Sequence, residues 1–271
     1  MLISTLCGKV GSEFVRLLKN KATLRLGAHS ADATKQAFPG LEVVRLELND
    51  AASVTAAVQG VDAVYLAAPG DFPPEPGKRL IDAAKQAGVK KVVMLSAMGV
   101  DAAPQSPLRQ VEVHLEGSGL AWTTWFKQNF STSHAQSIRA GVLAETAGDK
   151  KTAFIDTRDI AAVAAKALLE DGHAGKTYTL TGPELLSRGD VAGTLSKTLG
   201  RDVRYHAITD EQFREAMKPR VSASYLELLS RLYAGVRQGW TERTSDDVQR
   251  VLGRAPIAFA QFARDHRAIW S

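Results

Sequence analysis

The sequence predicts an α/β protein with a doubly wound parallel sheet and a small, mainly helical C-terminal cap. Short apolar runs of strand length alternate with amphipathic patterns of about ten residues from position 1 to 169, which is typical of βαβ units. After position 187 the patterns are mainly helical. The chain has 271 residues, which is enough for one large domain with an appended cap.

The expected elements follow from these patterns in chain order. Strands are expected at 1–5, 22–28, 41–48, 61–67, 89–96 and 120–125, and strand-like runs at 152–156 and 176–181. Helices are expected at 11–19, 51–59, 78–87, 110–116, 157–169, 189–199, 210–217, 222–233 and 256–266. Asn49 and Asp50 can cap the helix that follows them, and Gly60 can end it.

Composition and charge exclude several classes of protein. With 45% hydrophobic and 23% charged residues, the chain is too apolar for intrinsic disorder, and no apolar run reaches the ~18 residues of a membrane span. The net charge is +5, but Lys and Arg are interleaved with acids, which disfavours a nucleic-acid stripe. Cys7 is the single cysteine, which excludes an internal disulfide and suits a reducing compartment. The N-terminus does not resemble a secretory signal. We therefore expect a cytoplasmic monomer or homodimer that binds a small molecule, with no nucleic-acid or membrane partner.

The run ISTLCGKVG at 3–11 joins the first expected strand to the first helix. Its spacing matches a G-x-x-G-x-x-G phosphate-binding turn with Thr5 in the first glycine place. Gly8 would let a phosphate approach, and Gly11 would let the helix pack closely. A plain strand-to-helix turn is the alternative. The candidate cofactor-binding residues in this turn are Thr5, Cys7, Gly8, Lys9, Val10 and Gly11.

Two further strand ends are candidates for cofactor contacts. Ala67, Ala68 and Pro69 end the fourth strand, and their small side chains would permit close approach of a ribose or pyrophosphate, unless they only form a turn. The second strand ends in His29 and Ser30, with Lys35 nearby, where NAD-binding proteins carry an acidic residue. This neutral-to-basic end favours the 2′-phosphate of NADP over NAD; a polar solvent loop is the alternative.

Several segments together resemble the NmrA-like branch of the atypical short-chain dehydrogenase/reductases. They are LCGKVGSE (6–13), GVDAVY (60–65), AGVKKVVMLSA (87–97), GSGLAWT (117–123), FIDTRDIA (154–161), TYTLTGP (177–183) and DDVQRVLGRAP (246–256). The resemblance implies a dinucleotide-binding Rossmann-type domain at 1–185 and a substrate-binding cap at 186–271 packed on it. The run WFKQNFS at 125–131 is most similar to the quinone-reductase-like and ergot-type imine-reductase members.

The sequence departs from this family at two places. The first glycine of the phosphate turn is absent, and an L-R-P-N-like segment before the WFKQNFS run is missing. Both departures affect the expected cofactor site, so three hypotheses stay open. The first is an NADPH-dependent reductase, the second an NAD(P)-binding sensor or regulator without turnover, and the third a non-redox enzyme of secondary metabolism that reuses the fold.

The candidate catalytic residues are Ser96 and His114. Typical short-chain dehydrogenases use a Ser and a Tyr-x-x-x-Lys pair, but the run LRQVEVH at 108–114 contains neither tyrosine nor lysine. Hydride transfer to a quinone, an imine or a conjugated system needs less help from the protein. Ser96 could hold a substrate carbonyl or cap a loop, and His114 could donate a proton or lie on an exposed helix face. Glu112 is expected to face solvent, although it could also supply a proton.

The remaining candidates concern the substrate and metals. We expect the substrate-binding residues Met98, Trp125, Phe126, Asn129 and Phe130 to line a pocket for a flat apolar molecule, with a core role as the alternative. Cys7 has no base beside it in sequence and is interpreted as structural. The six histidines show no ligand spacing, so no metal is expected.

Overall fold

The computed structural model describes residues 1–4, 9–67, 73–97, 100, 103–120 and 134–271. These residues group into two compact units. Unit 1 contains Met1–Phe126 and Thr157–Thr179, and unit 2 contains Lys127–Asp156 and Leu180–Ser271. The sequence predicts instead a single boundary after position 185. The two divisions differ in residues 127–156 and 180–185, which belong to unit 2 but to the first predicted domain.

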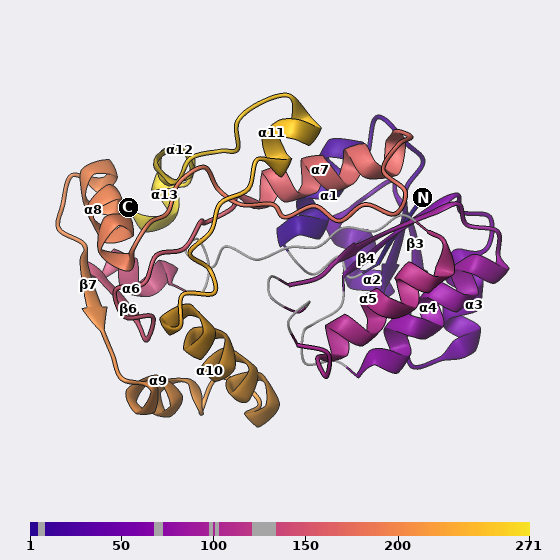
Figure 1. Ribbon diagram of the computed structural model, residues 1–271. Coiled ribbons are helices and arrows are strands. Elements are labelled where there is room, and N and C mark those ends of the chain that lie inside the picture. Colours follow the sequence, from indigo (N-terminus) through magenta and orange to yellow (C-terminus); the bar gives the residue numbers. More distant parts are fainter. Residues whose placement is uncertain (5–8, 68–72, 98–99, 101–102, 121–133) are drawn as a thin grey trace. The chain divides into compact units, whose positions relative to one another are not determined.

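Unit 1 is built on a five-stranded parallel sheet (Figure 1). Its strands are β1 (Leu2–Ser4), β2 (Arg25–Ala28), β3 (Glu42–Arg45), β4 (Ala63–Ala67) and β5 (Lys91–Leu95), in the spatial order β3-β2-β1-β4-β5. The chain therefore winds outward from β1 in one direction and then returns to continue in the other. This topology confirms the doubly wound parallel sheet predicted from the sequence.

Helices cover both faces of this sheet (Figure 1). They are α1 (Lys9–Leu18), α2 (Ala31–Ala37), α3 (Ala51–Val58), α4 (Pro74–Gln86), α5 (Pro107–Ser118) and α7 (Thr157–Leu169). The Asp50 carboxylate accepts hydrogen bonds from the N–H groups of Ala52 and Ser53, which fixes the start of α3 as predicted. Phe14 of α1 is fully buried against Tyr65 of β4, with the ring centroids 4.3 Å apart.

The largest core cluster of unit 1 lies between β4 and β5 and the helices α3, α4 and α5. Val64, Leu66, Val92 and Met94 supply the sheet side of this core, and all four are almost completely buried. Such apolar runs are typical of strands that are covered on both faces. The sheet is therefore a rigid support for the side chains that follow its strand ends.

Unit 2 contains a two-stranded parallel sheet and seven helices among the described residues. The strands are β6 (Val142–Glu145) and β7 (Arg204–Ala207), and the helices are α6 (Ala135–Arg139), α8 (Arg188–Leu199), α9 (Asp210–Met217), α10 (Ala223–Arg237), α11 (Asp247–Leu252), α12 (Phe259–Asp265) and α13 (Arg267–Trp270). Ser187 and Asp190 form a reciprocal capping box at the start of α8. The core of this unit gathers buried apolar residues of β6, α8, α12 and α13.

Some predicted elements were wrong. The run at 152–156 forms no strand, since Thr152 makes only an isolated antiparallel bridge with Leu186, and the run at 176–181 is not a strand either. Conversely, β6, β7, α2, α6 and α11 lie in segments for which the sequence predicted no regular structure. These elements are short, and among the residues that the structure describes β6 and β7 pair only with each other, so local periodicity gives a weak signal for them. Most of the strand predicted at 120–125 lies outside the described residues.

Candidate functional site

The carboxyl ends of the strands of unit 1 meet at one edge of the sheet. β1 and β4 are neighbours, and the winding direction reverses between them. In open α/β sheets, ligands bind outside the carboxyl ends at this switch point. Ser4 ends β1, and α1 begins at Lys9, so the free N–H groups of the first turn of α1 follow the strand end closely. A helix N-terminus at this place can bind a phosphate, and the assignment of a phosphate site here stays a prediction.

The predicted cofactor-binding residues are spread around this edge. Lys9, Val10 and Gly11 form the first turn of α1, and Val10 and Gly11 are buried. Ala67 is the last residue of β4 and lies opposite Leu95 of β5. Thr5, Cys7, Gly8, Ala68 and Pro69 lie outside the described residues.

At the end of β2, His29 is exposed and its Nδ1 forms an ion pair with Glu47 Oε1. Arg45 Nε lies 3.9 Å from the same carboxylate oxygen. Ser30 immediately precedes α2, which occupies residues that the sequence suggested were a loop, and Lys35 forms an exposed pair with Asp32 at 3.8 Å. Neighbouring parallel strands end at the same edge of a sheet, so the end of β3 brings Arg45 and Glu47 next to the end of β2. The sequence analysis took only residues that follow β2 into account at this place.

Ser96 directly follows β5 and is only 5% exposed. Its hydroxyl has no hydrogen-bond partner among the described residues. A buried hydroxyl without a partner costs about 1–3 kcal/mol, a penalty that a bound ligand can remove. The structure therefore places a hydrogen-bonding group at the end of β5 that the protein itself leaves unused in its described part.

His114 lies on α5, and its Nε2 is 2.6 Å from Asp82 Oδ1 of α4. Its imidazole is therefore occupied in a contact between two neighbouring helices. Within the described part of the chain no hydrogen bond or ion pair joins Ser96 to His114. The assignment of both residues as catalytic stays a prediction.

The expectation that Glu112 faces solvent was wrong. Glu112 is 2% exposed because it lies on the buried face of α5 with Leu108, Val111 and Leu115. Its Oε2 accepts a hydrogen bond from Arg109 Nη1 at 3.0 Å, whereas its Oε1 has no partner in the described structure. The helical spacing of these four positions was a signal in the sequence that could have revealed this burial.

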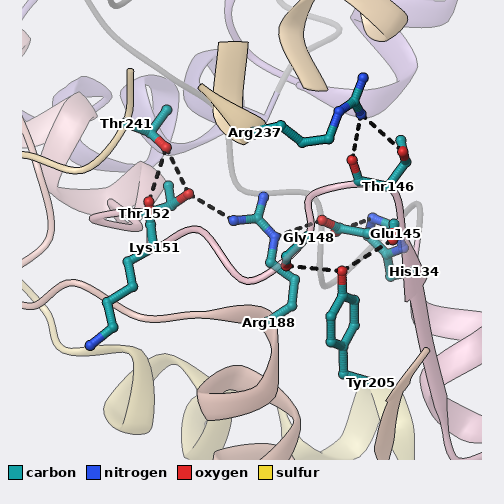
Figure 2. Close-up of polar contacts among 10 residues, drawn as sticks. All are labelled: His134, Glu145, Thr146, Gly148, Lys151, Thr152, Arg188, Tyr205, Arg237 and Thr241. Carbon is teal, nitrogen blue, oxygen red and sulfur yellow. Dashed lines mark hydrogen bonds and ion pairs between the residues drawn. The ribbon is translucent and has the colours of Figure 1, made fainter. Parts of the chain in front are cut away.

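Unit 2 holds a buried polar cluster that sequence reasoning missed (Figure 2). Glu145 lies at the end of β6, and its Oε2 accepts a hydrogen bond from Arg188 Nε at 2.8 Å. The other carboxylate oxygen, Oε1, lies 3.0 Å from His134 Nε2. Burial alone would raise the pKa of Glu145. The hydrogen bond from His134 and the charge of Arg188 outweigh that effect and lower the pKa of Glu145 to about 2.

Further hydrogen bonds extend this cluster into the neighbouring elements (Figure 2). Arg188 Nη1 donates to Thr152 Oγ1 at 2.7 Å, and Thr152 Oγ1 lies 2.9 Å from Thr241 Oγ1. The Tyr205 hydroxyl donates to the backbone carbonyl oxygens of Glu145 and Gly148. Because the participants come from different elements, their spacing in the sequence gives no indication that they meet.

The predicted substrate-binding residues Met98, Trp125, Phe126, Asn129 and Phe130 all lie outside the described residues. Within the part of the chain that is described, no cluster of His, Cys, Asp and Glu could hold a metal ion. In the same part, none of the helices combines the length and apolar character that crossing a membrane requires.

Residues 7–171 match a family model described as NAD(P)H-binding, which covers more than half of the chain and includes α1 and the strands β2 to β5. The chain belongs to this NAD(P)H-binding family. The match begins inside the glycine-containing turn identified in the sequence, and it supports the interpretation of that turn as a dinucleotide-binding element.

Relatives of this NAD(P)H-binding protein include reductases that match it along nearly their whole length. The NAD(P)H azoreductase of Xenophilus azovorans is 38% identical over 278 residues, which cover 96% of each chain. The (4-alkanoyl-5-oxo-2,5-dihydrofuran-3-yl)methyl phosphate reductase of Streptomyces griseus is 31% identical and covers 98% of this chain and 97% of its own.

Solved structures agree with this assignment. The NADPH-dependent quinone oxidoreductase of Escherichia coli, solved in complex with NADPH, has a TM-score of 0.83 and 25% identity, covering 97% of this chain and 98% of its own. Together, these findings confirm the resemblance to the NmrA-like branch and the Rossmann-type fold that the sequence predicted.

Proposed function

We propose that this protein is an NADPH-dependent reductase that transfers hydride to a small, flat electrophilic substrate such as a quinone, an imine, an azo compound or another conjugated system. The observation that carries the proposal is the 38% identity to an NAD(P)H azoreductase over 96% of both chains. The relatives named above act, by their names, on an azo group, a conjugated furanone and a quinone. All three classes are electrophilic and conjugated.

The residues of α5 support this substrate class. The helix PLRQVEVHLEGS contains neither a tyrosine nor a lysine, so it offers no Tyr-Lys pair for proton transfer to a simple carbonyl. An acceptor that is already electrophilic needs mainly correct positioning and exclusion of water. The absent pair therefore favours conjugated acceptors over simple ketones.

The described residues fit a dinucleotide. The first turn of α1 can accept a phosphate at its N–H groups, and Ala67 leaves room beside β4 for close approach. The hydroxyl of Ser96 offers a buried donor at the end of β5. When bound, the reduced nicotinamide would supply the hydride. Water or His114 would supply the proton.

We propose NADP rather than NAD as the preferred cofactor. His29, Lys35 and Arg45 provide positive or protonatable groups near the ends of β2 and β3, where a 2′-phosphate would lie. Glu47 partly offsets this charge, because both His29 and Arg45 pair with its carboxylate. A 2′-phosphate would compete with Glu47 for these groups.

We also propose that the protein acts in the cytoplasm as a monomer or homodimer, without a nucleic-acid partner. A single cysteine fits a reducing compartment. Basic residues alternate with acidic ones along the sequence, so the sequence contains no long basic run of the kind that nucleic-acid-binding proteins carry. Size-exclusion chromatography with light scattering would determine the oligomeric state.

The proposed function is tested by two measurements on the purified protein. Calorimetric titration is expected to give NADPH binding in the micromolar range and clearly weaker NADH binding. Absorbance at the nicotinamide band should then fall when a quinone, an azo dye or an imine is added with NADPH. Binding without oxidation of NADPH by any acceptor would indicate a sensor instead, and the absence of nucleotide binding would overturn both functions.

A further inference from the structure

The backbone that follows β3 is held in place beside the end of β2. The N–H of Leu46 donates a hydrogen bond to the carbonyl oxygen of the last residue of β2 at 2.9 Å. In the first turn of α3, Ser53 Oγ accepts from the N–H of Glu47 at 2.9 Å and donates to the carbonyl oxygen of Arg45 at 3.2 Å. These contacts fix where the side chains of Arg45 and Glu47 leave the backbone, next to His29.

Three charged or protonatable side chains therefore gather at this end of the sheet. The Glu47 carboxylate oxygen Oε1 forms an ion pair with His29 Nδ1 and lies 3.9 Å from Arg45 Nε. The side chain of Glu47 is 23% exposed, whereas those of His29 and Arg45 are 85% and 69% exposed. The imidazole and the guanidinium are thus open to a ligand, and the carboxylate lies close to any anion that they bind.

Glu47 Oε1 also keeps the capacity to accept a hydrogen bond. Among the residues that the structure describes, none donates a hydrogen bond to this oxygen, although it is shielded from solvent. The His29 imidazole that contacts it is largely exposed, so a hydroxyl of a ligand can replace this contact. A carboxylate oxygen is stabilised by an O–H donor and destabilised by a second negative charge. Glu47 can therefore distinguish a hydroxyl from a phosphate.

The 2′ position of a nucleotide ribose is where these two groups differ between NADH and NADPH. In Rossmann-type folds, an acidic residue about 20 residues after the glycine turn accepts a hydrogen bond from the 2′-hydroxyl of NAD. In this chain His29 is the first residue after β2 at that place. The Glu47 carboxylate reaches the same place from the neighbouring strand end, where it contacts His29.

We propose that Glu47 determines how strongly the protein prefers NADPH over NADH, and that it acts against this preference. Its carboxylate repels the 2′-phosphate of NADPH and accepts a hydrogen bond from the 2′-hydroxyl of NADH. His29 and Arg45 attract the phosphate, so the protein prefers NADPH but also binds NADH. This inference rests on the proposed reductase function and deepens it, because it names the residue that limits the cofactor selectivity.

The test compares Glu47→Gln with Glu42→Gln. Glu42 lies at the opposite end of β3, where its carboxylate pairs with Arg25 at 2.7 Å. Both substitutions remove one negative charge and keep the length of the side chain. The hydrogen bond that holds residue 47 uses its backbone N–H, so Glu47→Gln leaves this contact in place. Asp32→Asn removes a second carboxylate near the end of β2, one that pairs with Lys35, and is a further comparison.

The dissociation constants of NADPH and NADH are measured by calorimetry without an acceptor, at about 0.05 M and about 0.5 M sodium chloride. At low salt, Glu47→Gln is expected to tighten NADPH binding about 3- to 10-fold and to weaken NADH binding about 2- to 5-fold. At high salt the gain for NADPH should shrink, because ions screen the repulsion between the carboxylate and the phosphate. Tm should stay at the wild-type value, since largely exposed ion pairs contribute little to stability.

Glu42→Gln and Asp32→Asn should leave the ratio of the two dissociation constants unchanged. An equal effect of Glu47→Gln on both nucleotides would indicate a structural role and overturn the inference. An unchanged ratio in Glu47→Gln would also overturn it, as would a changed ratio in Asp32→Asn alone.

The same measurements separate this inference from the proposed function. Wild-type protein that binds both nucleotides but oxidises NADPH with no acceptor would overturn the reductase function, and the two dissociation constants would still decide the role of Glu47. Wild-type protein that binds neither nucleotide would overturn the inference directly.

Discussion

Arg188 Nε lies 2.8 Å from Glu145 Oε2, and both side chains are almost completely buried. The guanidinium also lies over the ring of Phe154, 5.0 Å from its centroid. Burying two charges is costly, and the pair is tolerated because His134 and Thr152 satisfy further atoms of the same two groups. The stability of unit 2 therefore depends on keeping both partners.

Replacing Arg188 with methionine should destabilise the protein by about 3–5 kcal/mol, because it leaves the buried Glu145 carboxylate with His134 as its one remaining partner among the described residues. Urea unfolding followed by circular dichroism measures the loss. The exposed pair Arg204–Asp202 supplies the control: Asp202→Asn should change the free energy of unfolding by less than about 1 kcal/mol. Equal effects of the two substitutions would show that burial does not determine the cost.

Glu145 should also make the free energy of unfolding depend on pH. Its pKa is lowered to about 2 in the folded protein from a value of 4.5 without these contacts, so its contribution is complete above about pH 4.5 and is lost as the pH falls toward 2. The shift corresponds to a stabilisation on the order of 3 kcal/mol. Urea midpoints measured between about pH 6 and pH 3 should fall more steeply for the wild type than for Glu145→Gln.

Other carboxylates also titrate in this range, since Lys91 and Arg214 lower the pKa values of Asp171 and Glu227. The difference between wild type and Glu145→Gln isolates the contribution of Glu145, because the other groups are common to both proteins. Parallel curves for the two proteins would contradict the assignment.

Ser96→Ala should separate ligand binding from stability. In the free protein the hydroxyl has no described partner, so its removal should leave the free energy of unfolding unchanged or raise it by up to about 1 kcal/mol. If a ligand uses this hydroxyl, binding of that ligand or its turnover should weaken about 3- to 10-fold. Thermal unfolding, NADPH titration and kcat/KM measure the effects.

Ser196 provides the opposite case for comparison. Its hydroxyl donates to the Ala192 carbonyl at 2.9 Å and also accepts from the backbone N–H of Val203 at 2.9 Å. Ser196→Ala should therefore lower Tm and leave nucleotide affinity unchanged. A Ser96→Ala protein that behaves like Ser196→Ala would show that Ser96 has only a structural role.

His29→Asp should reduce the preference for NADPH. The new carboxylate would stand beside Glu47 at the end of β2 and repel a 2′-phosphate, while a free ribose hydroxyl could donate to it. The ratio of NADH to NADPH dissociation constants is expected to fall about tenfold, with most of the change in NADPH. Lys90→Glu, an exposed charge change just before β5, is the control and should leave the ratio unchanged.

The residues of the candidate cofactor site and of the buried polar cluster differ in how far the sequence could reveal them. The strand-turn-helix unit at β1 and α1 was predicted because glycine spacing, strand and helix are consecutive in the chain. The burial of Glu112 was also encoded in the spacing of α5, but its charge led to the wrong expectation. The cluster of Glu145, Arg188 and His134 had no such local signal.

The sequence by itself determined the parallel α/β architecture, the family and the expected cofactor class, because these depend on local periodicity and on contiguous motifs. Only the tertiary structure decided that Arg45 and Glu47 share the strand end with His29, and that Glu145 and Arg188 are buried as a pair. These relationships join residues from separate elements. Burial and long-range pairing depend on how the whole chain packs, so spacing in the sequence cannot specify them.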